Sequence, residues 1–261
     1  MAKVLLVAVI AATIAVLAFV IGDRLRPKSW CHAGDEVAST LALDLVKTYF
    51  TALVAFVFVL GWQQHNAAHD HTVSEAKGLV ETYRAAESLP QPQRQRVQQL
   101  IRDYTDEVLT REWPLMENES RMSTASADTF ETLRRTVVAI RTSDPAVSEA
   151  RSKALSGIEK AAAARQDRGI DMERTVPQFM YIALCFGAGM VLLNPVLNGI
   201  RVTRRSIAMS GLLGIVVGVA LLAIHDLERP YTGAIHVPQD AFQQAKADYH
   251  RIGTAPDYFG E

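Results

Sequence analysis

The stretch LALDLVKTYFTALVAFVFVLGW, residues 41–62, decides the fold of this chain. It contains no acidic or basic residue after Lys47, and as a helix it is long enough to cross the roughly 30 Å hydrocarbon core of a bilayer. Residues 48–64 lack Asp, Glu, Lys and Arg, and so do three other stretches: residues 4–21, 175–200 and 206–224. Four such runs predict an all-α membrane protein with four transmembrane helices.

Most of the charge lies between the second and third apolar runs, from Asp70 to Arg174. Apolar residues in this block recur at helical spacing, which predicts a helical extramembrane domain inserted between helices two and three. Helix two has no proline between Trp62 and Leu89, so it is expected to leave the membrane as one long rod. The expected divisions are residues 1–62 for helices one and two, 63–176 for the helical domain, 177–225 for helices three and four, and 226–261 for a tail that docks on the helical domain.

The composition excludes several classes of function. The formal net charge of the 261 residues is -1, whereas a general nucleic-acid binder needs a basic surface, so we expect no nucleic-acid partner. Cys31 and Cys185 have the spacing of neither a metal site nor a disulfide framework. No nucleophile stands in a recognisable motif, and His225 and Asp226 are adjacent and therefore poorly placed to orient one another. We expect neither an enzyme nor a cofactor.

A polar stripe opens helix two. Its four residues follow the i, i+3, i+4, i+7 spacing of one helix face: Asp44, Lys47, Thr48 and Thr51. The stripe fits the vestibule of a pore, because ionisable residues in a membrane helix face the bundle interior or water. It fits equally well a helix end in the headgroup region, with Lys47 extended toward water.

An apolar segment follows the stripe and offers candidates for a constriction that gates by dewetting. The candidates are Leu53, Phe56 and Val57, and Phe50, Phe58 and several valines belong to the same apolar segment. Ordinary packing against lipid or other helices explains these residues too.

Two further motifs are weaker. His65 and His69 share a helix face, as two zinc ligands would, but a site needs a third ligand, and a polar collar where the helix leaves the bilayer is the alternative. Small residues in helix four predict close helix packing, within the bundle or between subunits. These residues are Gly211, Gly214 and Gly218.

Three stretches together resemble the bacterial bestrophin-like family. The first is FTALVAFVFVLGWQQHNAAHDHTVSEA, residues 50–76, and the second is YTDEVLTREWP, residues 104–114, with Glu112, Trp113 and Pro114. The third is an acidic residue, proline, an aromatic residue and glycine, followed by a valine and a phenylalanine, with tyrosine in place of the more usual phenylalanine at the aromatic position. Its residues are Glu228, Pro230, Tyr231, Gly233, Val237 and Phe242. The resemblance covers nearly the whole chain from helix two onward.

The resemblance implies the plan of the bestrophins, which are pentameric anion channels. Each subunit has four transmembrane helices and a helical cytosolic region, and helix two lines the pore through an apolar neck. No acidic run after helix four resembles the calcium clasp of the animal channels, so calcium gating is not expected here.

The orientation in the membrane is left open by two opposing signals. Lys and Arg are denser in the two short loops, which places those loops in the cytoplasm and the helical block outside. The family resemblance implies a cytosolic block, and we prefer this side. The expected location is the plasma (inner) membrane of a bacterium, as a multi-pass protein.

The leading hypothesis is a homo-oligomer, with five subunits as the resemblance implies, that passes inorganic anions through a pore lined by helix two. Asp44 would repel anions unless Lys47 or a neighbouring subunit pairs with it. The alternative is a non-conducting, membrane-anchored scaffold or sensor whose helical domain binds a partner.

Overall fold

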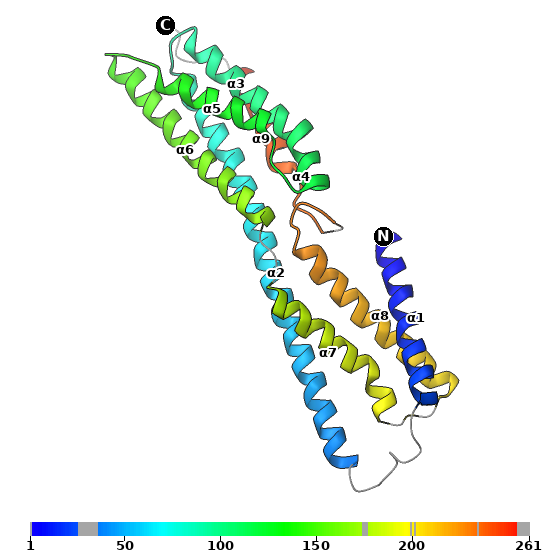
Figure 1. Cartoon of the computed structure of the whole chain (residues 1–261). Coiled ribbons are helices and arrows are strands. Elements are labelled where there is room, and N and C mark those ends of the chain that lie inside the picture. Colours follow the sequence, from blue (N-terminus) through cyan, green and yellow to red (C-terminus); the bar gives the residue numbers. More distant parts are fainter. Residues whose placement is uncertain are drawn as a thin grey trace. The chain divides into compact units, whose positions relative to one another are not determined.

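The computed structural model describes residues 2–25, 36–173, 177–198, 200, 202–233 and 235–254, and Cys31 lies outside them. The described residues are helical and form no strand, so the all-α prediction is confirmed. The helices, shown in Figure 1, are α1 (Ala2–Leu25), α2 (Glu36–Ala86), α3 (Gln93–Glu107), the π-helical segment η2 (Val108–Glu112), α4 (Trp113–Glu119), α5 (Thr124–Val138), α6 (Pro145–Glu173), α7 (Gln178–Leu197), α8 (Arg204–Leu227) and α9 (Asp240–Thr254).

Four helices of the described chain are long and apolar enough to cross a membrane. Their spans are Leu5–Leu25, Leu43–Ala86, Gln178–Leu197 and Arg204–Leu227, in agreement with the four predicted helices. Helix α2, which contains the second span, continues without a break for 51 residues, so the prediction of one long helix past Trp62 is also confirmed.

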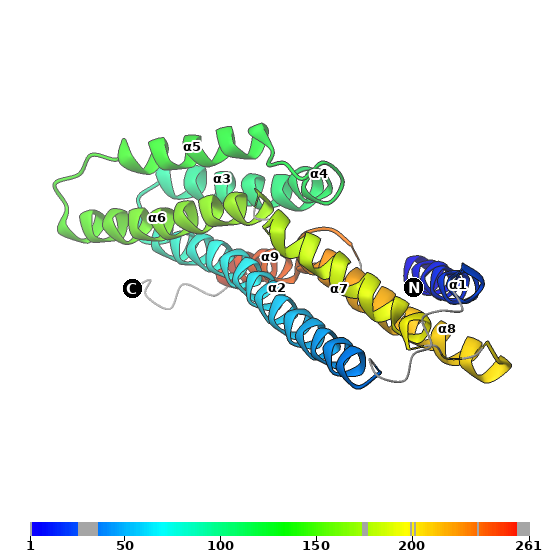
Figure 2. The same ribbon diagram turned by 60° about the horizontal axis from the view of Figure 1, so that its bottom comes forward.

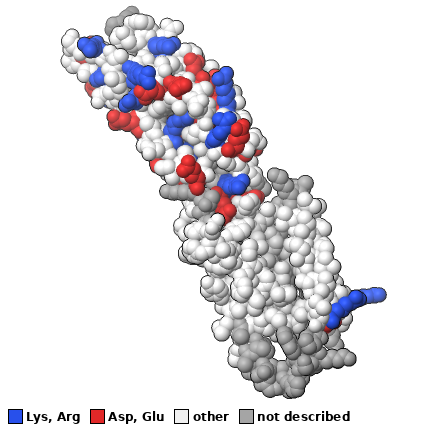
Figure 3. Space-filling view, in the orientation of Figure 1, with Lys and Arg blue, Asp and Glu red and all other residues white. Residues whose placement is uncertain are grey.

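The chain divides into two compact units. The apolar unit comprises Met1–Gln63 and Thr175–Glu228, and the polar unit comprises Gln64–Arg174 and Arg229–Glu261. Figure 3 shows Lys, Arg, Asp and Glu gathered over the polar unit, while the visible face of the apolar unit is almost free of them. A surface without charge is what a bilayer requires, because burying charge in hydrocarbon is costly.

The apolar unit has a core made by α2, α7 and α8. Phe50 and Val57 of α2 pack there against Leu184 and Val191 of α7. The backbone of α7 comes close to Phe50 because position 187 is glycine, where an added Cβ would lie 2.6 Å from the Phe50 ring. Small residues at helix contacts allow this close packing, which stabilises helix association in lipid, where the hydrophobic effect does not favour it.

The polar unit is built on the last turns of α2, with α6 running beside it in both views (Figures 1 and 2). The two helices cross at Gly78 and Gly157, where a Cβ at either position would lie within 2.8 Å of the other's carbonyl oxygen. Backbone contact of this kind needs glycine on both helices.

The segment after α8 turns sharply and then forms α9. The Val237 N–H donates to the Pro230 carbonyl at 2.7 Å, and Gly233 supplies a positive φ of 88°. Helix α9 buries Phe242 and Tyr249 in the core of the polar unit. Sequence analysis did not predict this helix, although its two aromatic residues are seven positions apart and therefore share a helix face.

Candidate functional site

One face of α2 is used for packing inside the apolar unit, and the other is open. Leu43, Phe50 and Val57 recur every seven residues and are buried, Val57 with only 1% of its surface exposed. Residues seven apart share a helix face, so this face points to the core of the apolar unit. The remaining faces of α2 in this unit are not covered by the described chain, and Leu41, Leu45 and Tyr49 are among their exposed side chains.

The polar stripe lies on the open side of α2. Lys47 Nζ lies 3.0 Å from Asp44 Oδ1, so the carboxylate has a cationic partner on its own helix. The Thr48 and Thr51 hydroxyls donate to the carbonyls of Asp44 and Lys47, both at 2.9 Å. The hydroxyl protons are therefore used inside the helix, and Lys47 is the residue of the stripe that keeps free donors.

The predicted apolar constriction is only partly on the open side. Val57 lies in the core and Leu53 packs against it, so neither faces away from the bundle. Of the three candidates, Val57 is the one that is fully buried within a single chain. Phe56 is 57% exposed.

The open face that continues the stripe carries different aromatic residues. Phe58 is seven positions after Thr51 and Trp62 is four positions later, and both are exposed. Sequence analysis placed Phe58 in the apolar segment but did not single out Trp62.

His65 and His69 lie one turn apart on α2. Within the part of the chain that the structure describes, no group of three or more His, Cys, Asp and Glu side chains is arranged to hold a metal ion. The described residues thus bring no third ligand to the pair.

The glycines of α8 face α1. A Cβ at Gly214 would lie 2.6 Å from Ala15 Cβ, one at Gly218 would clash with Ala11 Cβ, and one at Gly211 would lie 3.6 Å from Val16. The small residues therefore serve close packing within one chain, which was one of the two expected alternatives.

The second family stretch forms a buried charge cluster in the polar unit. It runs through the π-helical turn η2, which widens the helix and leaves Glu112 and Trp113 buried side by side. Arg168 of α6 reaches both Glu112 (2.6 Å) and Glu75 of α2 (2.9 Å), and all three side chains are fully buried.

Further donors complete the cluster. Arg165 makes a forked contact with Glu112, at 2.8 and 2.6 Å, and donates to the Tyr104 hydroxyl at 2.7 Å. Tyr104 in turn donates to Glu75, and Ser126 donates to Glu112 at 2.5 Å. Two carboxylates and two guanidiniums thus balance, which is the condition for burying charges without a large penalty.

The cluster is held ionised by its own members. Burial alone would raise the pKa of the Glu112 carboxyl, but the charge of Arg168 and hydrogen bonds from Arg165 and Ser126 lower it to about 2. Burial, and then the Glu75 charge, raise the pKa of the Tyr104 hydroxyl well above its usual range, so it stays a neutral donor. Such a cluster connects α2, η2, α5 and α6.

The third family stretch meets the second at Arg168. The guanidinium lies 5.5 Å from the Phe242 ring centre and 5.9 Å from that of Trp113, both in cation–π range. Tyr231 contacts Trp113 edge-on at 5.9 Å, and its hydroxyl donates to the Ala68 carbonyl. Sequence analysis singled out these motifs, and its first family stretch ends with Glu75 and Ala76. It missed Arg165 and Arg168, which no spacing connects to the motifs. Glu228 pairs locally with His225 at 3.7 Å, and Pro114 lies in the first turn of α4.

These features define an all-helical protein with four apolar spans and a helical polar unit closed by a buried ion cluster. The Bestrophin-like domain matches residues 9–242, and the chain belongs to this family. Comparison with curated proteins gives no significant match.

Solved structures share the fold at low sequence identity. A variant of a bacterial bestrophin homologue from Klebsiella pneumoniae is 12% identical, with a TM-score of 0.69, and covers 97% of this chain and 99% of its own. A variant of a structure described as a membrane protein is also 12% identical, with a TM-score of 0.67, and covers 97% of this chain and 100% of its own. A second such variant is 14% identical, with a TM-score of 0.61 and coverages of 97% and 99%.

Proposed function

We propose that this protein is an anion channel in which several copies of the chain, five by analogy with the bestrophins, surround a pore lined by α2. The observation that carries the proposal is the division of α2 into two sides. One side packs against α7 and α8, while the side with Asp44, Lys47 and Thr51 is not covered by the residues that the structure describes. An uncovered polar stripe on a membrane helix is stable only when it faces water or another subunit.

The stripe supports anions rather than cations at the pore mouth. Asp44 is paired with Lys47 at 3.0 Å, so its repulsion of an anion is reduced. The Lys47 ammonium has three donors and uses one on Asp44, which leaves two for a passing anion. Asp44 is the residue of the stripe that opposes anions, so its substitution should change the selectivity.

An apolar neck follows the stripe in this proposal. Phe58 and Trp62 continue the face of Thr51 and are exposed, so they take the place assigned earlier to Leu53 and Val57. Rings of apolar side chains gate by dewetting. Phe56 lies on a different side of the helix, and its substitution tests the assignment.

The proposal also includes the arrangement in the membrane. The apolar unit spans the inner membrane of a bacterium, and the polar unit, inserted between the second and third spans, lies outside the bilayer on the cytoplasmic side. The gathering of charge on the polar unit supports its extramembrane position (Figure 3). The side is tested by the reaction of cysteines introduced at exposed positions of α5 with an impermeant thiol reagent in intact and opened cells.

The function is tested by chloride flux from proteoliposomes that contain the purified protein. We expect flux from the wild type, reduced flux from Lys47→Ala, and altered gating from Phe58→Ala. Leu45→Ala changes an exposed residue off the stripe and serves as the control, with flux like the wild type.

Two results would overturn the proposal in different ways. Equal flux from Lys47→Ala, Phe58→Ala and the wild type would remove the pore from this face of α2, and an effect of Phe56→Ala alone would move it to the neighbouring face. No flux from a folded, oligomeric protein would favour the non-conducting scaffold or sensor.

In a conducting protein, Asp44→Asn is expected to shift the reversal potential toward greater anion selectivity.

A further inference from the structure

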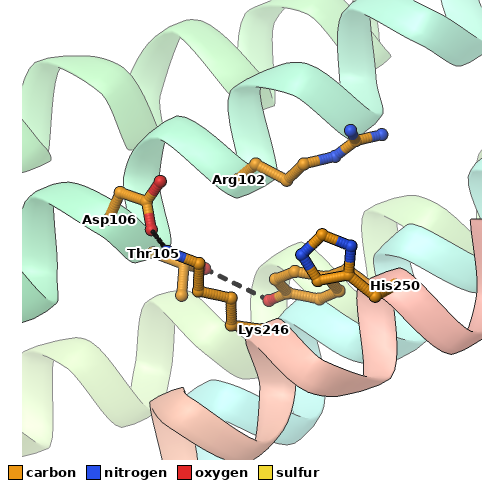
Figure 4. Close-up of a pocket in the computed structure, with 6 residues that line it drawn as sticks. Arg102, Thr105, Asp106, Lys246 and His250 are labelled. Carbon is orange, nitrogen blue, oxygen red and sulfur yellow. Dashed lines mark hydrogen bonds and ion pairs between the residues drawn. The ribbon is translucent and has the colours of Figure 1, made fainter.

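A small pocket lies between α3 and α9, within the polar unit. It has a volume of about 210 Å³ and is lined by Arg102, Thr105 and Asp106 of α3 and by Lys246, Tyr249 and His250 of α9. The two helices contribute with the same spacing, i, i+3 and i+4, so each presents one face to the pocket. Figure 4 shows Asp106 of α3 joined to Lys246 of α9, with the Arg102 side chain extending from α3 away from this pair, toward the side on which His250 of α9 lies.

Arg102 is held in place by an aromatic residue rather than by an acid. Its guanidinium lies 5.5 Å from the Tyr83 ring centre and donates to the Tyr83 hydroxyl at 2.8 Å. Tyr83 is itself stacked on Tyr249 at 4.7 Å. A guanidinium fixed in this way loses little entropy when it binds a further partner.

The charge of Arg102 is not neutralised within the described part of the chain, where it makes no ion pair. Its nearest acidic neighbours on α3 have other partners: Asp106 accepts from Lys246 at 2.7 Å, and Asp103 accepts from Gln99 at 2.7 Å. Arg102 has five N–H donors and uses one on Tyr83, so most of the fork remains available.

The inner wall of the pocket is neutral and already satisfied. Thr105 donates its hydroxyl proton to the Ile101 carbonyl at 2.9 Å and lies 3.2 Å from the Tyr249 hydroxyl, which is thereby the donor of that contact. Burial raises the pKa of the Tyr249 hydroxyl, which keeps it uncharged. The donors left for a ligand are cationic or imidazole groups: Arg102, Lys246 and His250.

We propose that this pocket binds a small anion through a phosphate or carboxylate group, with Arg102 as the forked donor and Lys246 and His250 as the partners on α9. Phosphate and carboxylate match the planar fork of arginine, which forms two parallel hydrogen bonds with either group. The volume suits inorganic phosphate or a short dicarboxylate. Because the ligand would connect α3 to α9, its binding would stabilise the docking of α9.

The test uses the full-length protein in detergent at constant ionic strength. Inorganic phosphate and succinate are titrated separately by calorimetry, and the melting temperature is followed in parallel. We expect saturable binding of one of them at millimolar concentration or below, with a rise in melting temperature. The ligand that binds more tightly identifies which of the two groups the pocket recognises.

The variants locate the binding. Arg102→Gln is expected to weaken binding roughly tenfold or more, since a forked charged contact is lost, and Arg102→Lys to recover part of it. His250→Gln removes a pocket donor whose side chain makes no hydrogen bond or ion pair among the described residues. It therefore decides the result if Arg102→Gln misfolds. Arg94→Gln, on the same helix but outside the pocket, is the matched control and should bind like the wild type.

Absence of saturable binding by either probe would overturn the inference, as would equal binding by Arg102→Gln, His250→Gln and the wild type. The readout is binding and melting rather than flux, so it is independent of whether the protein conducts.

Discussion

The two units of this protein solve the problem of packing long helices in opposite ways. In the apolar unit, α8 approaches α1 through Gly214 and Gly218, and the core contains no charge. In the polar unit, Arg168 and Glu112 are completely buried at the centre. The contrast shows that a buried charge can be accommodated where each partner is satisfied, whereas a unit that faces lipid relies on small residues and close contact.

Removing Arg168 is expected to have the largest effect. Arg168→Met would leave Glu75 and Glu112 buried without their shared partner, which costs about 3–5 kcal/mol. We expect the polar unit to unfold at a much lower temperature, as measured by circular dichroism in detergent. Arg135→Met, at an exposed arginine of α5, is the control, and equal melting of the two variants would contradict a central role for the cluster.

Acid should weaken the polar unit through Glu112. Burial raises its pKa, but Arg168, Arg165 and Ser126 lower it to about 2, from an ordinary value of 4.5. The folded state binds fewer protons than the unfolded state between these values, so the contribution to stability is complete above about pH 4.5 and is lost as the pH falls toward 2. Melting temperature against pH should fall less steeply in this window for Glu112→Gln, and parallel curves would refute the assignment.

The crossing of α2 and α6 should be sensitive to a single side chain. Gly157→Val places a Cβ 2.5 Å from the Thr82 hydroxyl and 2.8 Å from the Gly78 carbonyl. We expect a loss of about 1–3 kcal/mol, as is typical of overpacking. Gly169→Ala, in the same helix with no atom within 4 Å of an added Cβ, should be neutral or slightly stabilising when both variants are melted together.

Disrupting the glycine contact between α8 and α1 in the apolar unit should reduce stability by as much as Gly157→Val does, or less. Gly214→Val would push α8 away from Ala15 and Ala11 of α1, at 2.6 and 2.7 Å from an added Cβ. The expected result is a lower temperature of aggregation in detergent for this variant. In Gly189→Ala of α7, the added Cβ meets no atom within 4 Å, so this variant should behave like the wild type. If Gly214→Val also aggregated at the wild-type temperature, the contact with α1 would not contribute to stability.

Among these interactions, the exposed ion pairs should contribute least to the stability of the polar unit. Glu131 pairs with Arg134 and Arg135 on the surface of α5, at 3.1 and 3.0 Å. Water and salt screen such pairs, so Glu131→Gln should not change the melting temperature measurably at physiological ionic strength. A large decrease in melting temperature would show that ion pairs at the surface of this unit stabilise it as much as the buried pairs of Arg168 do.

Much of this organisation could be predicted because hydropathy and helical period are local properties. Uncharged runs long enough for a bilayer predicted the four spans, and the absence of proline predicted that α2 continues past Trp62. Helix α9 escaped prediction because its apolar positions are few, and its aromatic residues find their partners in helices distant in the sequence.

The sequence by itself determined the helices, the four apolar spans and the segregation of charge, because each depends on neighbours within a few turns. Only the tertiary structure decided which sides of those helices are covered. It placed Val57 in the core and left Phe58 open, because only the packing of α7 and α8 against α2 determines which face is buried. It also brought Glu75, Glu112 and Phe242 to Arg168, because a buried guanidinium needs acidic and aromatic partners, and only folding assembles partners so distant in sequence.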